Sequence, residues 1–197
     1  MIETTEVKAF FDRLAPEWDE HTVRDEAVIL KILDAARIRA GVHLLDVACG
    51  TGVLIPDYLG RGAASVTGVD LSETMAEIAR RKFSGDARVT ILCADAETAA
   101  FPRRYDRIVV YNALPHFADV ERLIKHLSGY LLPGGVLTAA HDRSRENINA
   151  HHRGMSSALA DDLLPADALA AIFAQSLDVV SVVSDDRMYQ VVGKKRE

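Results

Sequence analysis

The sequence predicts an α/β fold with a mostly parallel sheet and helices on both faces. Apolar, strand-like runs alternate with helix-like segments along the 197 residues. The first run, 42–47, is apolar at most positions, as a strand buried on both faces is. The run ends in a loop of small residues, 48–52, and a helix is expected to begin directly after this loop. This alternation is typical of one domain around a parallel sheet, and no internal repeat or low-complexity linker divides the chain.

Two helices are expected before the first strand, over residues 5–15 and 23–40. The second has an apolar face and should end at Gly41, because glycine commonly terminates helices. Five strands should follow, with helices between them, near residues 42–47, 65–70, 88–93, 105–111 and 135–140.

The last quarter of the chain predicts two more helices and two more strands. Ser144 is placed as the N-cap of a helix that should stop near Gly154. Residues 165–175 should form another helix. Two strands, Val179-Val180 and 189–192, are then expected around Asp185-Asp186.

Composition and charge agree with a single globular domain, 1–197. With 49% hydrophobic and 26% charged residues, the chain has neither a disordered nor a membranous composition. Its longest uncharged stretch, 127–140, is too short to span a bilayer. The net charge of −6 argues against a nucleic-acid partner, and the N-terminus lacks a signal-peptide core. We therefore expect a cytoplasmic protein without nucleic-acid or membrane partners.

The loop after the first strand predicts a nucleoside site. Small residues let a ligand approach the backbone closely, and the first N–H groups of the next helix face it. Asp70 ends the second strand, where an acid can accept hydrogen bonds from both hydroxyls of a ribose. A dinucleotide fingerprint would need a third glycine, but Ile55 stands there. A pyrophosphate-bearing ligand such as NAD is therefore less expected than a nucleoside with a smaller tail.

The motif D-V-A-C-G-T-G at 46–52, with V-D-L-S at 69–72, resembles the class I S-adenosylmethionine (SAM)-dependent methyltransferases. Segments 89–97, 105–112 and 131–137 match the same pattern in order, so the resemblance covers roughly residues 7–141. It implies a Rossmann-like, doubly wound, seven-stranded sheet with a C-terminal antiparallel hairpin. It also implies SAM as cofactor, with S-adenosylhomocysteine (SAH) as its product.

By this resemblance, Asp70 would hold the ribose hydroxyls, Asp95 the adenine amino group, and the Ala96 N–H a ring nitrogen. The other implied cofactor residues lie at the same strand ends or flank the nucleoside: Asp46, Ala48, Cys49, Gly50, Gly52, Leu71, Met75 and Asn112.

Some of these assignments have structural alternatives. Asp70 and Asp95 each precede a segment with helical character and could cap it. Leu71 and Met75 could belong to the apolar core. Ala48 stands where the family often has glycine, a variant that should cost little.

The segment 10–19 resembles the lid of ubiquinone-pathway methyltransferases, which makes residues 1–40 the expected lid. Trp18 would close over the methionine end of the cofactor, offering an indole N–H where a tyrosine hydroxyl is common. Alternatively, Phe10, Phe11 and Trp18 only dock the lid helix on the sheet.

Two histidines are candidate catalytic bases. His116 follows the fourth strand and His141 the fifth, so both should face one crevice, and imidazole titrates near neutral pH. His116 could equally be structural, whereas His141 is less expected from the family's pattern and is the better candidate for contact with the acceptor. Cys49 and Cys93, the only cysteines, form no metal pair by spacing, and a metal site of His141, His151 and His152 is weaker still, so no metal is expected.

Residues 142–163 occupy the place where the family inserts substrate-selecting structure. Arg145, Asn149 and His152 share one helix face by spacing and are the expected substrate residues. A solvated face is the alternative.

The function expected is methyl transfer to a small-molecule acceptor. Methylation of RNA or protein, and SAM binding without catalysis, are the alternatives, with an NAD-dependent dehydrogenase a distant third. The sequence does not identify the acceptor, and a homodimer is one assembly that it leaves open.

Overall fold

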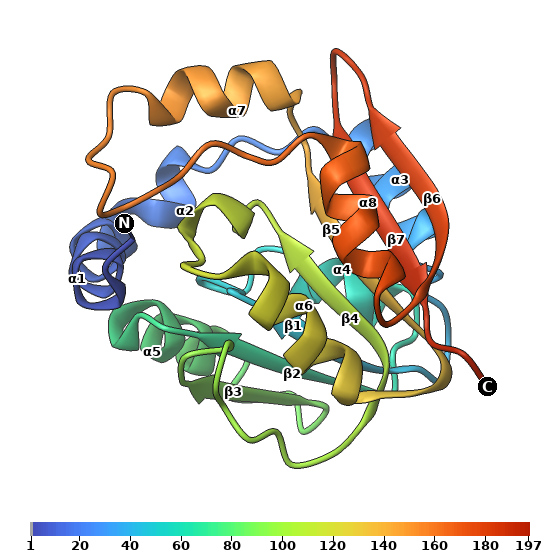
Figure 1. Ribbon diagram of the computed structural model, residues 1–197. Coiled ribbons are helices and arrows are strands. Elements are labelled where there is room, and N and C mark those ends of the chain that lie inside the picture. Colours follow the sequence, from blue (N-terminus) through green and yellow to red (C-terminus); the bar gives the residue numbers. More distant parts are fainter. Residues whose placement is uncertain (1) are drawn as a thin grey trace.

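The computed structural model describes residues 2–197, which form a seven-stranded sheet flanked by helices (Figure 1). The strand order is β3-β2-β1-β4-β5-β7-β6. The first five strands in this order run parallel, and β7 runs antiparallel to both β5 and β6. This is the predicted doubly wound sheet with its C-terminal hairpin. The strands are β1 (His43–Val47), β2 (Ser65–Asp70), β3 (Val89–Cys93), β4 (Tyr105–Tyr111), β5 (Leu131–His141), β6 (Asp178–Ser184) and β7 (Tyr189–Lys194).

Helices cover both faces of the sheet. One apolar core joins the sheet to α6 (Val120–Gly129) and α8 (Ala166–Ala174). The core on the opposite face includes residues of α3 (Glu26–Ala35), α4 (Ile55–Gly60) and α5 (Glu73–Lys82). The strand order reverses between β1 and β4, and ligands of such folds bind beyond the carboxyl ends of the strands at that point.

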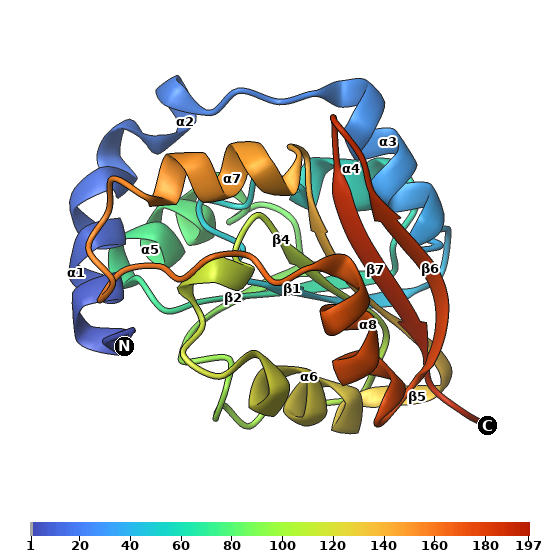
Figure 2. The same cartoon turned by 45° about the horizontal axis from the view of Figure 1, so that its top comes forward.

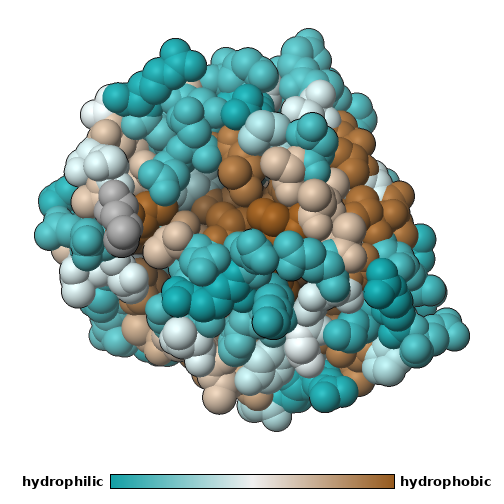
Figure 3. Space-filling view, viewed as in Figure 1, coloured by the Kyte–Doolittle hydropathy of each residue, from teal (hydrophilic) through white to brown (hydrophobic). Residues whose placement is uncertain are grey.

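Three further helices lie beyond the end of β4: α1 (Thr4–Leu14), α2 (Trp18–His21) and α7 (Arg145–His152) (Figures 1 and 2). Two short 3-10 turns, η1 (Ala15–Glu17) and η2 (Leu114–His116), complete the set. The space-filling view shows hydrophobic residues gathered in a hollow between α7 and α6, with hydrophilic residues around it (Figure 3). Within residues 2–197, no helix has the length and apolarity needed to cross a membrane.

The largest difference from the predicted elements concerns the helix expected over 23–40. It begins at Glu26, because the Asp25 side chain accepts a hydrogen bond from the Val28 N–H and caps it. It ends at Ala35, because Arg37 takes a left-handed conformation (φ 56°) that a helix cannot continue through. The predicted cap of α7 is confirmed, since Ser144 Oγ accepts from the Asn147 N–H.

Candidate active site

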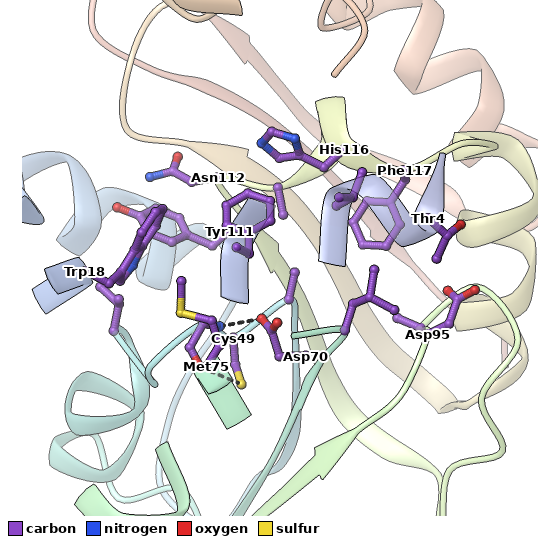
Figure 4. A pocket seen from close by; sticks show the side chains of 18 of the residues that line it. Thr4, Trp18, Cys49, Asp70, Met75, Asp95, Tyr111, Asn112, His116 and Phe117 are labelled. Carbon is purple, nitrogen blue, oxygen red and sulfur yellow. Dashed lines mark hydrogen bonds between the residues drawn. The ribbon is translucent and has the colours of Figure 1, made fainter. Parts of the chain in front are cut away.

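A cavity opens at the carboxyl ends of β1, β2 and β4, beneath α1 and α2. Ten of the residues predicted for the cofactor line it: Trp18, Ala48, Cys49, Gly50, Asp70, Leu71, Met75, Asp95, Ala96 and Asn112. The cavity is elongated (Figure 4). Trp18, Tyr111 and Asn112 lie at one end, Thr4 and Asp95 at the other, and Asp70 between them. The topology therefore gathers residues from five separate stretches of sequence into one site.

The loop after β1 has a tightly turned backbone. Ala48, Gly50 and Gly52 all have positive φ, at 54°, 56° and 86°. For Ala48 this left-handed conformation costs about 1 kcal/mol of stability. Alanine in place of the family's glycine is therefore more destabilising here than expected. Gly52 does not line the cavity, and a Cβ on it would lie 2.4 Å from a ring carbon of Phe83. This second glycine is required by packing.

Asp70 is placed at the centre of the cavity wall. Its two carboxylate oxygens accept hydrogen bonds from the backbone N–H groups of Gly50 (2.7 Å) and Ser72 (2.9 Å). The helix that follows is capped by Ser72, whose hydroxyl accepts from the Met75 N–H, so Asp70 is not the cap. Burial raises the pKa of Asp70 to about 6. Each oxygen keeps a second lone pair that can accept from a ligand hydroxyl.

Asp46 lies behind the loop and does not line the cavity. The carboxylate is fully buried and accepts a hydrogen bond from the Tyr58 hydroxyl (3.1 Å). Burial raises its pKa to about 7. Asp46 therefore stabilises the end of β1 and would not contact a ligand in the cavity.

The end of β3 supplies the far wall. Asp95 accepts from the Glu97 N–H (2.9 Å) within a turn, and no helix follows, so it caps none. Ala96 is buried beside it, and Glu97 lines the same end. The Glu97 carboxylate accepts from the Ala118 N–H and pairs with Arg122. Sequence reasoning did not select Glu97, although it lies only two positions after Asp95.

Side-chain contacts fasten the lid over the cavity. Thr51 Oγ1 donates to Asp19 Oδ1 (2.5 Å), which joins α2 to the loop after β1. Arg24, just beyond α2, donates to the Val53 carbonyl oxygen (2.7 Å). On α1, Asp12 accepts from the Ser72 hydroxyl (2.6 Å) at the start of α5. Burial raises the pKa of Asp12, but hydrogen bonds from Lys8, Ser72 and Thr74 outweigh burial and hold this pKa below its usual range.

The lid also contributes lining residues that the sequence prediction missed. Thr4, Val7 and Phe11 line the cavity from one face of α1. Their spacing of three and four positions was the available signal. Phe11 packs edge-on against Trp18, with ring centroids 5.8 Å apart. Phe10 does not line this cavity.

A second cavity adjoins the first at the Trp18 end. Phe11, Trp18, Asn112 and His116 line both, and His141 and His152 line the second one. The two candidate bases therefore face neighbouring parts of one crevice. Among residues 2–197, no group of three or more His, Cys, Asp or Glu side chains is arranged to hold a metal ion.

The three histidines differ in their hydrogen bonds. Nδ1 of His116 donates to the Leu159 carbonyl oxygen (2.8 Å), so the neutral ring has its lone pair on Nε2. Burial lowers the pKa of His116. His141 is buried, its Nε2 has no hydrogen-bond partner within residues 2–197, and burial lowers its pKa to about 3. His152 Nδ1 also has no partner, and burial lowers its pKa to about 4.

The other two expected substrate residues do not line the second cavity. Nε of Arg145 donates to the Leu163 carbonyl oxygen (2.7 Å), and Asn149 Oδ1 accepts from the Leu163 N–H (2.8 Å). Both side chains thus hold the segment after α7 in place. Of the predicted face, only His152 is directed to the cavity.

Asn112 lines both cavities, but both polar atoms of its side-chain amide are already hydrogen-bonded. Nδ2 donates to Asp142 Oδ1 (2.9 Å), and Oδ1 accepts from the Asp142 N–H (3.1 Å). The Tyr111 hydroxyl donates to the other carboxylate oxygen of Asp142 (2.8 Å). This network joins the ends of β4 and β5, and only the pairing of these strands brings its members together.

Comparisons with known proteins agree with this geometry. A family model described as a methyltransferase domain matches residues 44–135. The ubiquinone biosynthesis O-methyltransferase of Coxiella burnetii is 34% identical over 112 residues, 56% of this chain and 47% of that protein. The chain thus spans about half the length of the curated relatives it matches.

Solved structures show the same fold. The N-methyltransferase NodS of Bradyrhizobium japonicum, in complex with SAH, superposes with a TM-score of 0.74 and 16% identity, covering 97% of this chain and 99% of that one. The magnesium protoporphyrin IX methyltransferase of Synechocystis PCC 6803, with bound SAH, gives 0.73 and 19% identity, covering 98% and 99%.

Proposed function

We propose that this chain is a SAM-dependent methyltransferase, which binds SAM beneath the lid and methylates a small-molecule acceptor. The match of residues 44–135 to a methyltransferase-domain model and the fold shared with NodS support this proposal. The observation that supports this most strongly is the order of groups along the first cavity. Carboxylates lie at its far end and its centre, and an aromatic lid covers the remaining end.

The residues present fit the cofactor. Asp70 has lone pairs for the ribose hydroxyls, and Asp95 lies where the adenine amino group would be recognised. Met75 and Leu71 provide apolar surface against which the nucleoside would pack. Trp18 and the backbone of Gly50 would enclose the methionine end; a Cβ on Gly50 would lie 3.7 Å from the indole nitrogen. When bound, SAM supplies a methyl group on a positively charged sulfur, which keeps the bonding electron pair after transfer.

The chain's own task is then to orient the acceptor and to remove its proton. His116 suits the second task, because its Nδ1–H is held by a carbonyl oxygen and its Nε2 is free to accept. His141 is less suited to removing the proton. With a pKa of about 3, its imidazole is a weak base at neutral pH.

A small acceptor fits better than a macromolecular one. The lid closes the cavity through Asp19 and Arg24, so an acceptor must fit beneath α1, α2 and α7. The net charge of −6 gives no broad basic surface for RNA. The named relative acts in ubiquinone biosynthesis, which is the synthesis of a small molecule.

Two measurements test the proposal. Calorimetric titration should show SAM binding and no binding of NAD. Incubation with methyl-labelled SAM and cell extract should then place label in the acid-soluble fraction, above a control without enzyme. Label confined to protein or RNA would overturn the acceptor class. Binding of SAM with no label in either fraction, across extracts from several sources, would favour SAM binding without catalysis.

A further inference from the structure

The second cavity is placed to hold the acceptor, provided that the proposed function is right. Of the residues it shares with the first cavity, Trp18 and Asn112 lie at the end away from Asp95, and His116 lies between the two ends (Figure 4). A molecule in the second cavity would therefore meet the methionine end of the cofactor and not the adenine end. That is where the methyl group is carried.

The surface of the second cavity is aromatic on the lid side. Phe10, Phe11 and Trp18 all line it. The Phe11 ring meets His116 edge-on, with centroids 4.9 Å apart and planes at 88°. His116 in turn meets His152 at 5.2 Å. Aromatic walls of this kind favour a planar ligand, because rings pack well by stacking or edge-to-face contact.

The deep wall of the second cavity carries no charge except the Asp142 carboxylate, which is already hydrogen-bonded. His141 and His152 are neutral near pH 7 because burial lowers the pKa of each. The Asp142 carboxylate accepts from Tyr111 and Asn112.

The remaining charged or titratable groups that line this cavity are His21, Arg143 and His151, and all three are exposed. A buried anion would therefore meet no buried cation, and an unpaired buried charge is costly.

Three imidazole nitrogens of the histidines that line this cavity have no hydrogen-bond partner among residues 2–197. Nε2 of His141 and Nδ1 of His152 are buried without partners, and Nε2 of His116 carries a lone pair. Buried polar atoms are normally satisfied, so unpartnered ones in a cavity wall point to a ligand that supplies the missing bonds. A hydroxyl or N–H group on the ligand can donate to Nε2 of His116.

From this geometry we propose that the second cavity binds an uncharged, planar acceptor whose reacting oxygen or nitrogen bears a hydrogen, donated to Nε2 of His116. His141 and His152 are positioning residues that hydrogen-bond the acceptor. On transfer, the acceptor's heteroatom gains the methyl carbon and its proton passes to His116.

Three matched probes test this inference: 2-naphthol, 2-naphthoate and 2-methoxynaphthalene. They share one ring system and differ in charge and in the transferable hydrogen. Each is titrated into the SAH-saturated protein while the histidine ring nitrogens are followed by NMR. We expect 2-naphthol to shift the signals of His116, His141 and His152, with those of His43 and His126 unchanged. The other two probes should bind at least about fivefold more weakly.

A variant gives an independent reading. His152→Leu should weaken 2-naphthol binding about tenfold, as expected for one lost hydrogen bond, and leave SAH affinity within about twofold. His126→Leu is the matched control, because this half-buried histidine on α6 lines neither cavity. Unlike a change at the fully buried His141, neither substitution replaces a fully buried side chain.

The outcomes separate the two proposals. If SAH does not bind the wild-type protein, the proposed function fails and this inference fails with it. If SAH binds and 2-naphthol leaves the three ring signals unmoved, this inference is wrong and the proposed function stands. Equal or tighter binding of 2-naphthoate would refute the uncharged class, and equal binding of 2-methoxynaphthalene would refute the need for a hydrogen.

Discussion

Replacing His141 with glutamine should change how the stability of the protein responds to pH. His141 is 3% exposed, and its Nε2 has no hydrogen-bond partner in the described part of the chain. Burial lowers its pKa to about 3, against 6.5 for an ordinary histidine. Below pH 6.5 the unfolded chain therefore binds a proton at His141 that the folded chain does not. The free energy of unfolding falls as the pH drops from 6.5 toward 3.

The size of the effect follows from the two pKa values. Each pH unit below 6.5 removes about 1.4 kcal/mol, so at pH 5.0 the wild-type protein loses about 2 kcal/mol through His141. Asp46 and Asp70 act in the opposite direction, because burial raises their pKa values to about 7 and about 6. Their contributions are common to wild type and variant, so the difference between the two proteins isolates His141.

Urea unfolding followed by circular dichroism, at pH 7.5 and pH 5.0, measures this difference. Going from the higher to the lower pH, the wild-type protein should lose about 2 kcal/mol relative to His141→Gln. Tyr189→Phe is the control. It removes a buried, unpartnered hydroxyl from a ring that packs against His141 at 6.0 Å, and adds no group that titrates in this range. If wild type and His141→Gln change by the same amount, His141 is not the buried neutral imidazole described above.

Three further predictions concern the proposed cofactor site. Asp70→Asn should weaken SAM binding by about 2 kcal/mol, roughly thirtyfold, through the loss of a charged acceptor; an unchanged dissociation constant by calorimetry would reject the ribose assignment. Thr51→Val removes the hydroxyl that donates to Asp19 and should lower SAM affinity about fivefold through faster dissociation, by stopped-flow fluorescence. Gly52→Ala places a Cβ in a left-handed backbone and against the Phe83 ring, so it should lower the free energy of unfolding, measured by thermal unfolding, by about 3 kcal/mol. Gly41→Ala has the same backbone strain (φ 82°) but open space around the Cβ, so it should lower that free energy by only about 1 kcal/mol. Equal losses would contradict the packing role of the second glycine.

Much of the lining of the first cavity could be predicted because it depends on local sequence. A buried strand, a tight turn and a helix follow one another within 46–60, and Asp70 ends the next strand. In a parallel sheet, strand ends meet at one edge, so these residues had to come together. The pattern could not tell which side of the loop a side chain occupies. Asp46 and Gly52 were therefore placed in the cavity, although they lie behind it.

The lining of the second cavity was less predictable. Arg145, Asn149 and His152 were expected on one helix face, but the first two bind the backbone of Leu163. No periodicity predicts where an irregular segment such as 153–164 returns. The side-chain network of Asp142 was invisible for the same reason, since its members are joined only by the pairing of β4 with β5.

The sequence by itself determined the class of fold and most of the polar and small residues that line the first cavity. Hydrophobic periodicity defines which segments are buried strands and amphipathic helices, and that order of elements permits few topologies. Only the tertiary structure decided the second cavity and the state of its histidines. The pKa of a buried imidazole and the partners of its nitrogens depend on what packs around it, and the groups around His116, His141 and His152 come from the lid, η2, β5 and α7, which are far apart in the chain.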